Sequence, residues 1–263
     1  MSTLSFLSLR LALPLLCVMS ASAQQATPDF SGVYYPVNPF AGAAPPADGA
    51  VRTGLPKGGP PPKPTRSAPL SDGSRGRAPG APDLKPEYIA KWQAISKSRV
   101  AGSYEYDYSA KCLPPGMPAM MNMAYGMEVM QTKDKVTFFS ELNDAMRRVY
   151  LDGRKPSQKV MEDPTYAGYS TGHWEGDTLV VDTVAIHEQT FIEGFSPHSD
   201  ALSVHERIRM KEPTLLEDTI TVTDPKALVK PWSTVKNYRK ALPGSGKDEL
   251  REFACPEGLG EAR

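Results

Sequence analysis

Gly172-His173-Trp174-Glu175-Gly176-Asp177-Thr178-Leu179-Val180-Val181-Asp182-Thr183 is the stretch that decides the fold of this chain. At its centre, Glu175-Gly176-Asp177 is a short polar cluster whose glycine can adopt a positive φ, as hairpin turns demand. The following residues, 178–184, are β-branched or apolar except for Asp182, which predicts a buried strand. The stretch therefore predicts a β-hairpin. A carboxylate within a buried strand needs a partner or a function, so Asp182 requires an explanation.

Further segments with a period of two surround this hairpin, and turn residues separate them. They cover residues 128–131, 135–142, 146–151, 201–210, 215–223 and 232–239, and residues 29–35 resemble a separate N-terminal strand that is entered through a turn. Seven or eight short antiparallel strands with little helix predict a mainly β fold. Their sequential linkage favours a single antiparallel up-and-down barrel. A short amphipathic helix is expected before the barrel, at residues 86–95, where Ile89, Trp92 and Ile95 share one face.

The first 23 residues are typical of a secretory signal. An apolar run follows Arg10 and ends in Ala21-Ser22-Ala23, a cleavage pattern that would leave Gln24 first. We therefore expect a periplasmic or secreted protein with no integral membrane segment after cleavage. The remaining chain divides into an N-terminal strand region (24–37), a Pro/Gly-rich flexible segment (38–83) and a helix-plus-barrel domain (84–263).

The cysteines and the charge balance indicate one covalent link and exclude one class of partner. Signal removal leaves Cys112 and Cys255, and an even pair in an oxidising compartment predicts a disulfide, with two buried free thiols as the alternative. Basic and acidic residues balance at 30 each. Because no basic stripe is visible, nucleic acid is not an expected partner.

Methionines are concentrated between Met117 and Met130, which hold six of the 11 in the chain. Methionine fills irregular gaps and also suits adaptable apolar surfaces. The segment is therefore either a plug that fills the core or a flexible lid over an apolar cavity.

Several motifs together resemble a family of exported, largely uncharacterised bacterial proteins. Its hallmark is Gly-x-Ser-x-Gly-x-Trp-Glu-Gly-Asp-Thr-Leu-Val-Val-Asp-Thr, which spans residues 168–183 here, with Tyr169 where the family usually has histidine. The other matching segments are residues 31–34, 112–118, 148–154, 197–200 and 206–207. The resemblance implies a strand order similar to lipocalin-like barrels, and it carries no activity that can be transferred.

Strand alternation selects two carboxylates as candidate acid or base residues. Glu206 shares a face with Val204, Ile208 and Met210, and Asp182 shares a face with Val180 and Val184. Both are expected to point into the barrel, where an unpaired carboxyl would have a raised pKa. The structural alternative is an ion pair of either carboxylate with Arg147 or Arg148.

The four histidines offer possible partners for these carboxylates. His187 follows the central strand and His198 lies in the next loop, so hairpin geometry can bring both to one barrel mouth. No His-x-His pair, phosphate loop or dinucleotide fingerprint occurs, so neither a metal nor another cofactor is expected. The Gly168-Tyr169-Ser170-Thr171-Gly172 match to a nucleophile elbow is rejected, because a strand and not a helix is expected after it.

Three functions remain open. The first is a barrel that binds a small apolar or aromatic molecule, with Trp174, Tyr150, Phe139, Asp200 and Arg207 as candidate ligand contacts. The second is a cofactor-independent lyase, isomerase or hydrolase that uses Asp182 or Glu206 with His187 or His198. The third is a structural envelope protein with a filled barrel.

Overall fold

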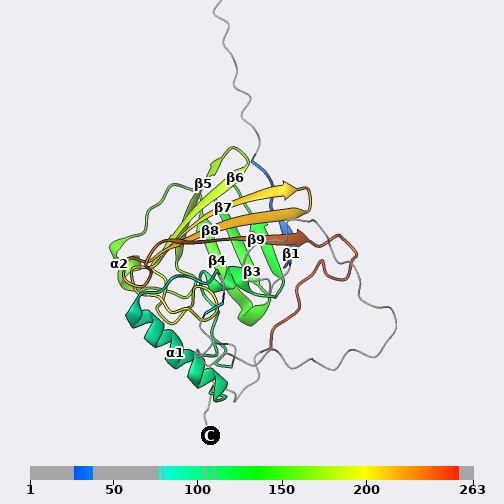
Figure 1. Ribbon diagram of the computed structural model, residues 1–263. Coiled ribbons are helices and arrows are strands. Elements are labelled where there is room, and N and C mark those ends of the chain that lie inside the picture. Colours follow the sequence, from blue (N-terminus) through cyan, green and yellow to red (C-terminus); the bar gives the residue numbers. More distant parts are fainter. Residues whose placement is uncertain (1–26, 38–76, 79, 104, 109, 255–263) are drawn as a thin grey trace, which may run out of the picture.

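The computed structural model describes residues 27–37, 77–78, 80–103, 105–108 and 110–254. Nine strands follow one another around a closed barrel (Figure 1). The mainly β fold predicted from the sequence is confirmed. The strands are β1 (Gly32–Pro36), β2 (Met127–Gln131), β3 (Lys135–Ser140), β4 (Ala145–Tyr150), β5 (Tyr169–Glu175), β6 (Thr178–Val184), β7 (Ser203–Glu212), β8 (Leu215–Thr223) and β9 (Trp232–Lys240).

The hairpin at residues 172–183 forms as the sequence predicts. β5 and β6 pair antiparallel along their whole length, and Glu175 lies opposite Thr178 across the turn. Gly176 takes a φ of +62° at the first turn position, a conformation that costs glycine little.

The expectation of a wholly antiparallel barrel is wrong at one place, because β4 and β5 pair parallel, with Val149 opposite Ser170. Each antiparallel pairing reverses the strand direction, so a closed ring of nine strands needs at least one parallel pairing. The other eight pairings are antiparallel. The connection between β4 and β5 is long enough to return the chain to the starting end, and it contains the short helix α2 (Gln158–Glu162).

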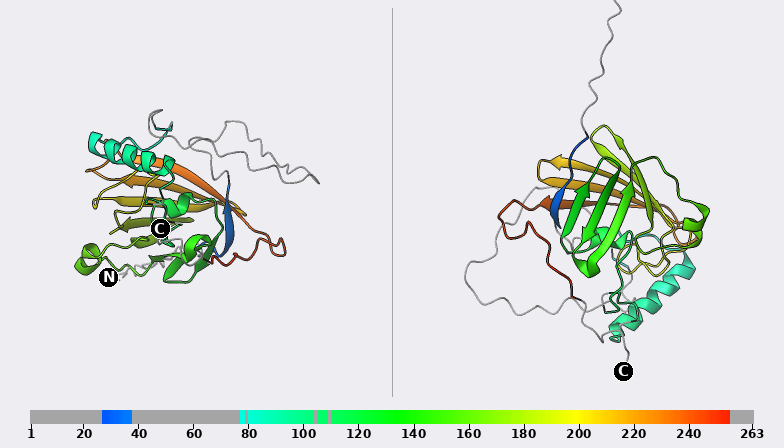
Figure 2. Two further views of the ribbon diagram at one scale, coloured as in Figure 1. Left: turned by 90° about the horizontal axis from the view of Figure 1, so that it is seen from below. Right: turned by 180° about the vertical axis from the view of Figure 1, so that it is seen from behind.

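The long connections gather at one end of the barrel, here called the capped end. They include the 3-10 helices η1 (Ala119–Asn122) and η2 (Leu142–Asp144), residues 185–202 and residues 224–231. Helix α1 (Pro86–Val100) lies outside the strands at this end (Figures 1 and 2). Trp92 of α1 donates its indole N–H to the Gly194 carbonyl at 3.3 Å. Tight turns form the opposite end, where Phe30 and Trp174 pack with ring centroids 5.1 Å apart.

The methionine-rich segment fills the capped end. Met117, Met120 and Met121 are buried in the same core cluster as the inward side chains of the strands. The Tyr238 hydroxyl of β9 donates to the Met121 carbonyl at 2.5 Å and ties the segment to the barrel wall. Of the two roles open from the sequence, these residues have the role of a plug.

Several expectations fall partly or wholly outside the described residues. The signal segment lies there, as does Cys255, so the Cys112–Cys255 disulfide stays a prediction. Most of the Pro/Gly-rich segment also lies there, but its last part is described and packs on the barrel. Leu84, just after that segment, forms a bridge with Leu228 in the connection before β9.

Candidate functional site

The middle of the barrel contains a buried ion pair between Arg147 of β4 and Glu206 of β7. Arg147 is 1% exposed and Glu206 is fully buried. The pairing is bidentate: Nη1 donates to Oε1 at 2.8 Å, and Nη2 donates to Oε2. Of the ion pairs that the sequence offers as the structural alternative, the pair of Glu206 with Arg147 is confirmed. Bidentate geometry is the strongest form of such a pair.

Two hydroxyls complete the shell of the guanidinium. Arg147 Nε donates to Ser170 Oγ at 3.0 Å, and Nη2 donates to Thr183 Oγ1 at 2.9 Å. The two hydroxyl oxygens lie 2.8 Å apart. Ser170 is therefore a buried hydrogen-bond partner inside the barrel, which explains the serine of the motif without a nucleophile.

The glycines that flank Ser170 are explained by close packing. A Cβ on Gly172 would lie 2.8 Å from the Val180 carbonyl oxygen, and one on Gly168, where φ is +67°, would lie 2.9 Å from that of Val184. Glycine is required at both positions because backbone atoms cannot move away as a flexible side chain can.

A second carboxyl, Asp218 of β8, lies beside this ion pair. It is fully buried, and as a carboxylate neither of its oxygens has a hydrogen-bond donor among the described residues. Burial raises the pKa of Asp218 well above its usual range, and the neighbouring negative charge of Glu206 raises it further. When Asp218 is protonated, its O–H can donate a hydrogen bond to the Glu206 carboxylate. The two carboxyls therefore form a pair that favours holding one proton.

Asp182 does not point into the barrel, so the sequence expectation for this residue is wrong. Its cross-strand partner on β7 is His205, whereas Glu206 lies opposite Val181. Partners across a sheet share a face, so Val181 and Glu206 point inward and Asp182 points outward. The Asp182 side chain is 64% exposed, and its Oδ1 lies 2.8 Å from His205 Nδ1. The two candidate carboxylates are on opposite faces of the sheet.

The candidate histidines both lie in the connection between β6 and β7. His198 is buried, its Nε2 lies 2.7 Å from Thr190 Oγ1, and its Nδ1 lies 2.8 Å from the Ser199 carbonyl. Burial lowers the pKa of His198. His187 stacks on Tyr166 with centroids 4.9 Å apart. Neither histidine makes a hydrogen bond to Asp182 or Glu206, whose partners are His205 and Arg147.

The Pro197-His198-Ser199-Asp200 motif fastens this connection to the one before β9. Asp224 accepts hydrogen bonds from the Ser199 amide and from the Ser199 hydroxyl, both at 2.7 Å. It also accepts from the amides of Lys226 and Ala227. Buried carboxylates that accept several backbone N–H bonds stabilise loop structure, which gives the motif a structural role.

The five candidate ligand contacts are not brought together. Trp174 packs on Phe30 at the turn end, and Tyr150 lies on the outer face with its ring under Arg154, whose Cζ is 4.1 Å from the centroid. Phe139 is half-buried on the outer face opposite Met146. Asp200 and Arg207 form exposed ion pairs with Lys226 and Glu175, respectively.

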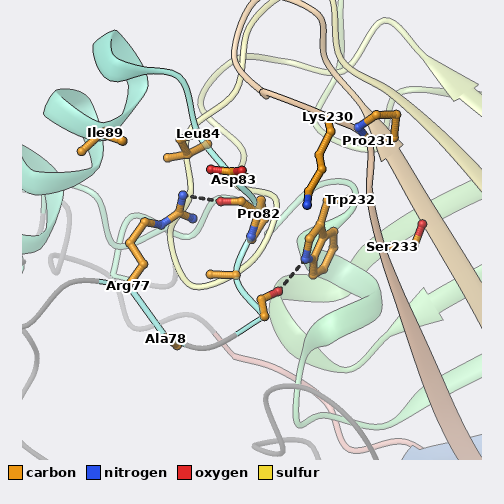
Figure 3. A pocket seen from close by; sticks show the side chains of 12 residues that line it. Arg77, Ala78, Pro82, Asp83, Leu84, Ile89, Lys230, Pro231, Trp232 and Ser233 are labelled. Carbon is orange, nitrogen blue, oxygen red and sulfur yellow. Dashed lines mark hydrogen bonds between the residues drawn. The ribbon is translucent and has the colours of Figure 1, made fainter.

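A cavity of about 500 Å³ lies at the capped end, outside the barrel core, between residues 77–78 and 80–89 on one side and the start of β9 on the other (Figure 3). We call it the Trp232 pocket. Its lining includes Arg77, Pro82, Leu84, Ile89, Lys230 and Trp232. The Trp232 indole N–H donates to the Gly80 carbonyl at 2.7 Å, which fixes the orientation of the ring.

Arg77 holds the outer wall of the Trp232 pocket in place. Its guanidinium donates to the Pro82 carbonyl and to the Ser196 hydroxyl. The Arg77 Cζ also lies 5.5 Å from the centroid of the Trp92 ring in α1. The wall, the helix and the β6–β7 connection are thereby joined at one residue.

The described part of the chain lacks both a cluster of metal-ligating side chains and a membrane-spanning helix. It contains no group of three or more His, Cys, Asp or Glu side chains placed to hold a metal ion. None of its helices is long and apolar enough to cross a bilayer.

Sequence reasoning missed Asp218 and the Trp232 pocket. Asp218 had a signal, since it alternates with Leu216, Ile220 and Val222, all of which are buried. The same argument that placed Glu206 inward applies to it. No sequence pattern indicates the Trp232 pocket, because Arg77 lies in the Pro/Gly-rich segment and Lys230 lies in a connection. Side chains in such segments follow no regular period.

Comparison with known proteins establishes no family for this chain. No family model matches it, and neither does any curated protein. Two similar solved structures are crystal structures of the fluorescent protein UnaG, one of the wild type and one of a mutant. The wild type is 15% identical, with 52% of this chain and 89% of that chain covered and a TM-score of 0.29. The mutant is 16% identical, with 44% and 71% covered and a TM-score of 0.27.

Proposed function

We propose that this protein binds a small apolar or aromatic molecule in the Trp232 pocket. The observation that carries the proposal is the cavity of about 500 Å³ beside a half-buried indole. Small-molecule sites have volumes of roughly 300–1,000 Å³ and combine apolar walls with a few polar groups. The Trp232 pocket lies within this range of volumes, and its lining combines an indole and apolar side chains with the charged residues Arg77, Asp83 and Lys230.

The walls favour a flat ring over a flexible polar ligand. The Trp232 ring is held by its hydrogen bond to Gly80, so it presents a fixed surface on which a second ring can stack. Pro82, Leu84, Ile89 and Pro231 supply apolar surface around it. A rigid wall also lowers the entropy lost on binding.

We place the site at the capped end because the middle of the barrel is occupied. Arg147, its partners and the apolar side chains of the strands fill that region. A ligand there would have to displace a bidentate ion pair, and the separation of buried charges is strongly unfavourable. In this proposal the barrel is the frame and the connections form the site, while the lipocalin-like relationship stays a proposal.

Fluorescence titration with N-phenyl-1-naphthylamine, a neutral aromatic probe that brightens in apolar sites, tests the proposal. Trp232→Ala should weaken binding at least about tenfold, because the stacking surface is lost. Trp232→Phe keeps an aromatic face and should retain most of the affinity, which separates lost stacking from lost folding. Val235→Ala, an exposed position three residues along β9 and on the opposite face of the strand, is the matched control. Equal binding by the wild type and Trp232→Ala would contradict the proposal.

We also propose that the protein acts outside the cytoplasm, on the basis of the signal-like first 23 residues. Cell fractionation followed by N-terminal sequencing should find the mature chain in the exported fraction, beginning at Gln24. An uncleaved chain in the cytoplasm would contradict this part.

A further inference from the structure

The Trp232 pocket carries an excess of positive charge. Its charged lining residues are two cations, Arg77 and Lys230, and one anion, Asp83. The Asp83 carboxylate is close enough to Arg77 to influence its guanidinium electrostatically. One positive charge is therefore left without a counter-charge in the lining.

Arg77 does not provide that charge to a ligand, because its guanidinium is already used. Two of its nitrogens donate to Pro82 and Ser196, and its Cζ faces the Trp92 ring. Moving this group would release the pocket wall from both the helix and the β6–β7 connection. Arg77 is a structural cation.

Lys230 is the cation that can contact a ligand. In Figure 3 its side chain extends toward the space between Pro82 and Trp232, both of which line the pocket with it. Among the described residues Lys230 forms no ion pair, whereas Lys226 and Lys236, its neighbours along the chain, pair with Asp200 and Glu193. An unpaired ammonium group in the same lining as an indole suits a ring that bears an anionic substituent.

We infer that the Trp232 pocket selects aromatic molecules that carry a negatively charged group, with the ring against Trp232 and the anion bound by Lys230. The inference rests on the proposed function, since it names the class of molecule that the same pocket accepts. The wall residues determine that an aromatic ring fits, and Lys230 determines the preferred charge.

A matched pair of probes separates the two claims. 8-Anilinonaphthalene-1-sulfonate is N-phenyl-1-naphthylamine with one added sulfonate, so the two differ only in the anion. Wild-type protein should bind the sulfonate probe several-fold more tightly. Lys230→Gln should weaken sulfonate binding about three- to fivefold, the range expected for one partly exposed charge contact, and leave the neutral probe unchanged. Lys230→Arg should retain the preference.

Two controls complete the experiment. Lys133→Gln removes the same charge from an exposed lysine at the turn end and should change neither affinity. Added salt should weaken binding of the sulfonate probe alone, because it screens charges near the surface.

The outcomes distinguish the inference from the proposal beneath it. If neither probe binds, or if Trp232→Ala leaves the affinity for both probes unchanged, the proposed function is contradicted and the inference fails with it. If the neutral probe binds through Trp232 but the sulfonate gives no advantage and Lys230→Gln has no effect, the inference alone is overturned. The predicted pattern is a loss at Lys230 that is confined to the anionic probe.

Discussion

The barrel interior and the Trp232 pocket use charge in opposite ways. Inside the barrel, Arg147 donates to Glu206, Ser170 and Thr183 at once, within the core cluster of buried apolar side chains. In the pocket, Lys230 has no counter-ion among the described residues and lies beside a cavity of about 500 Å³. A saturated cation stabilises a fold, whereas an unsaturated one beside a cavity is available to a ligand.

This difference indicates how the molecule divides its tasks. The strands form a closed frame with no edge to protect, and the interior holds it together. The connections at the capped end carry the cavity, as ligand sites in barrels commonly lie at their mouths. Changes to the interior should therefore alter stability, and changes to the pocket should alter binding.

The largest effect is expected for Arg147→Met. The substitution leaves Glu206 buried without its cation, which should lower the free energy of unfolding by about 3–5 kcal/mol. Urea unfolding followed by circular dichroism measures the loss. Arg148→Met is the matched control, because the next residue along β4 faces solvent and should lose less than about 0.5 kcal/mol.

A double substitution tests whether the Arg147 effect is due to the stranded charge. Arg147→Met combined with Glu206→Leu should recover most of the stability, since apolar side chains of similar volume can replace a buried ion pair. If Arg147→Met costs no more than Arg148→Met, the interior is not the stabilising region that the comparison requires.

Asp218→Asn should give the next largest effect, and in the opposite direction. The pKa of Asp218 is raised in the folded protein above the value of 3.8 that applies to an exposed group. Between these two pKa values the folded state binds more protons than the unfolded state, so stability falls as pH rises above about 4. The amide needs no proton to act as a donor, so the variant should lose this pH dependence.

Unfolding free energies measured in urea from pH 5 to pH 8 test this expectation. At the upper end the variant should be more stable than the wild type by about 1–3 kcal/mol, the range for relieving an unsatisfied buried group. Parallel pH profiles for the two proteins would show that Asp218 is not protonated in the fold.

Asp182→Asn should have the smallest effect. Its pair with His205 is largely exposed, and exposed pairs contribute at most a fraction of a kcal/mol. Unfolding free energy should change by less than about 0.5 kcal/mol, and probe binding should not change. A large loss of probe binding would show that Asp182 is a functional residue. It would also contradict the assignment of the binding site to the capped end.

The contrast between Glu206 and Asp182 explains what the sequence can predict. Polar and apolar residues alternate along β7, so the pattern predicts which face points inward, and the prediction that Glu206 lies on that face is correct. β6 has buried residues on both faces, including Val180 on the outer one. Alternation along β6 therefore does not show which face points into the barrel. Only the pairing of Val181 with Glu206 decides the orientation of Asp182, and register is not visible in one strand.

The barrel was predictable to the same degree as its strands. The hairpin at residues 172–183 and the sequential order follow from local patterns and short turns. The parallel β4–β5 pairing follows from the number of strands in the closed ring, which the sequence left at seven or eight. The Trp232 pocket depends on contacts between distant connections, such as that of Gly80 with Trp232, for which no local pattern exists.

A crystal structure of the protein with 8-anilinonaphthalene-1-sulfonate tests the central claim most directly, because it locates the ligand. The account predicts ring density against Trp232, the sulfonate within hydrogen-bond distance of Lys230 Nζ, and an intact Arg147–Glu206 pair. Probe density inside the barrel, with that pair separated, would contradict it.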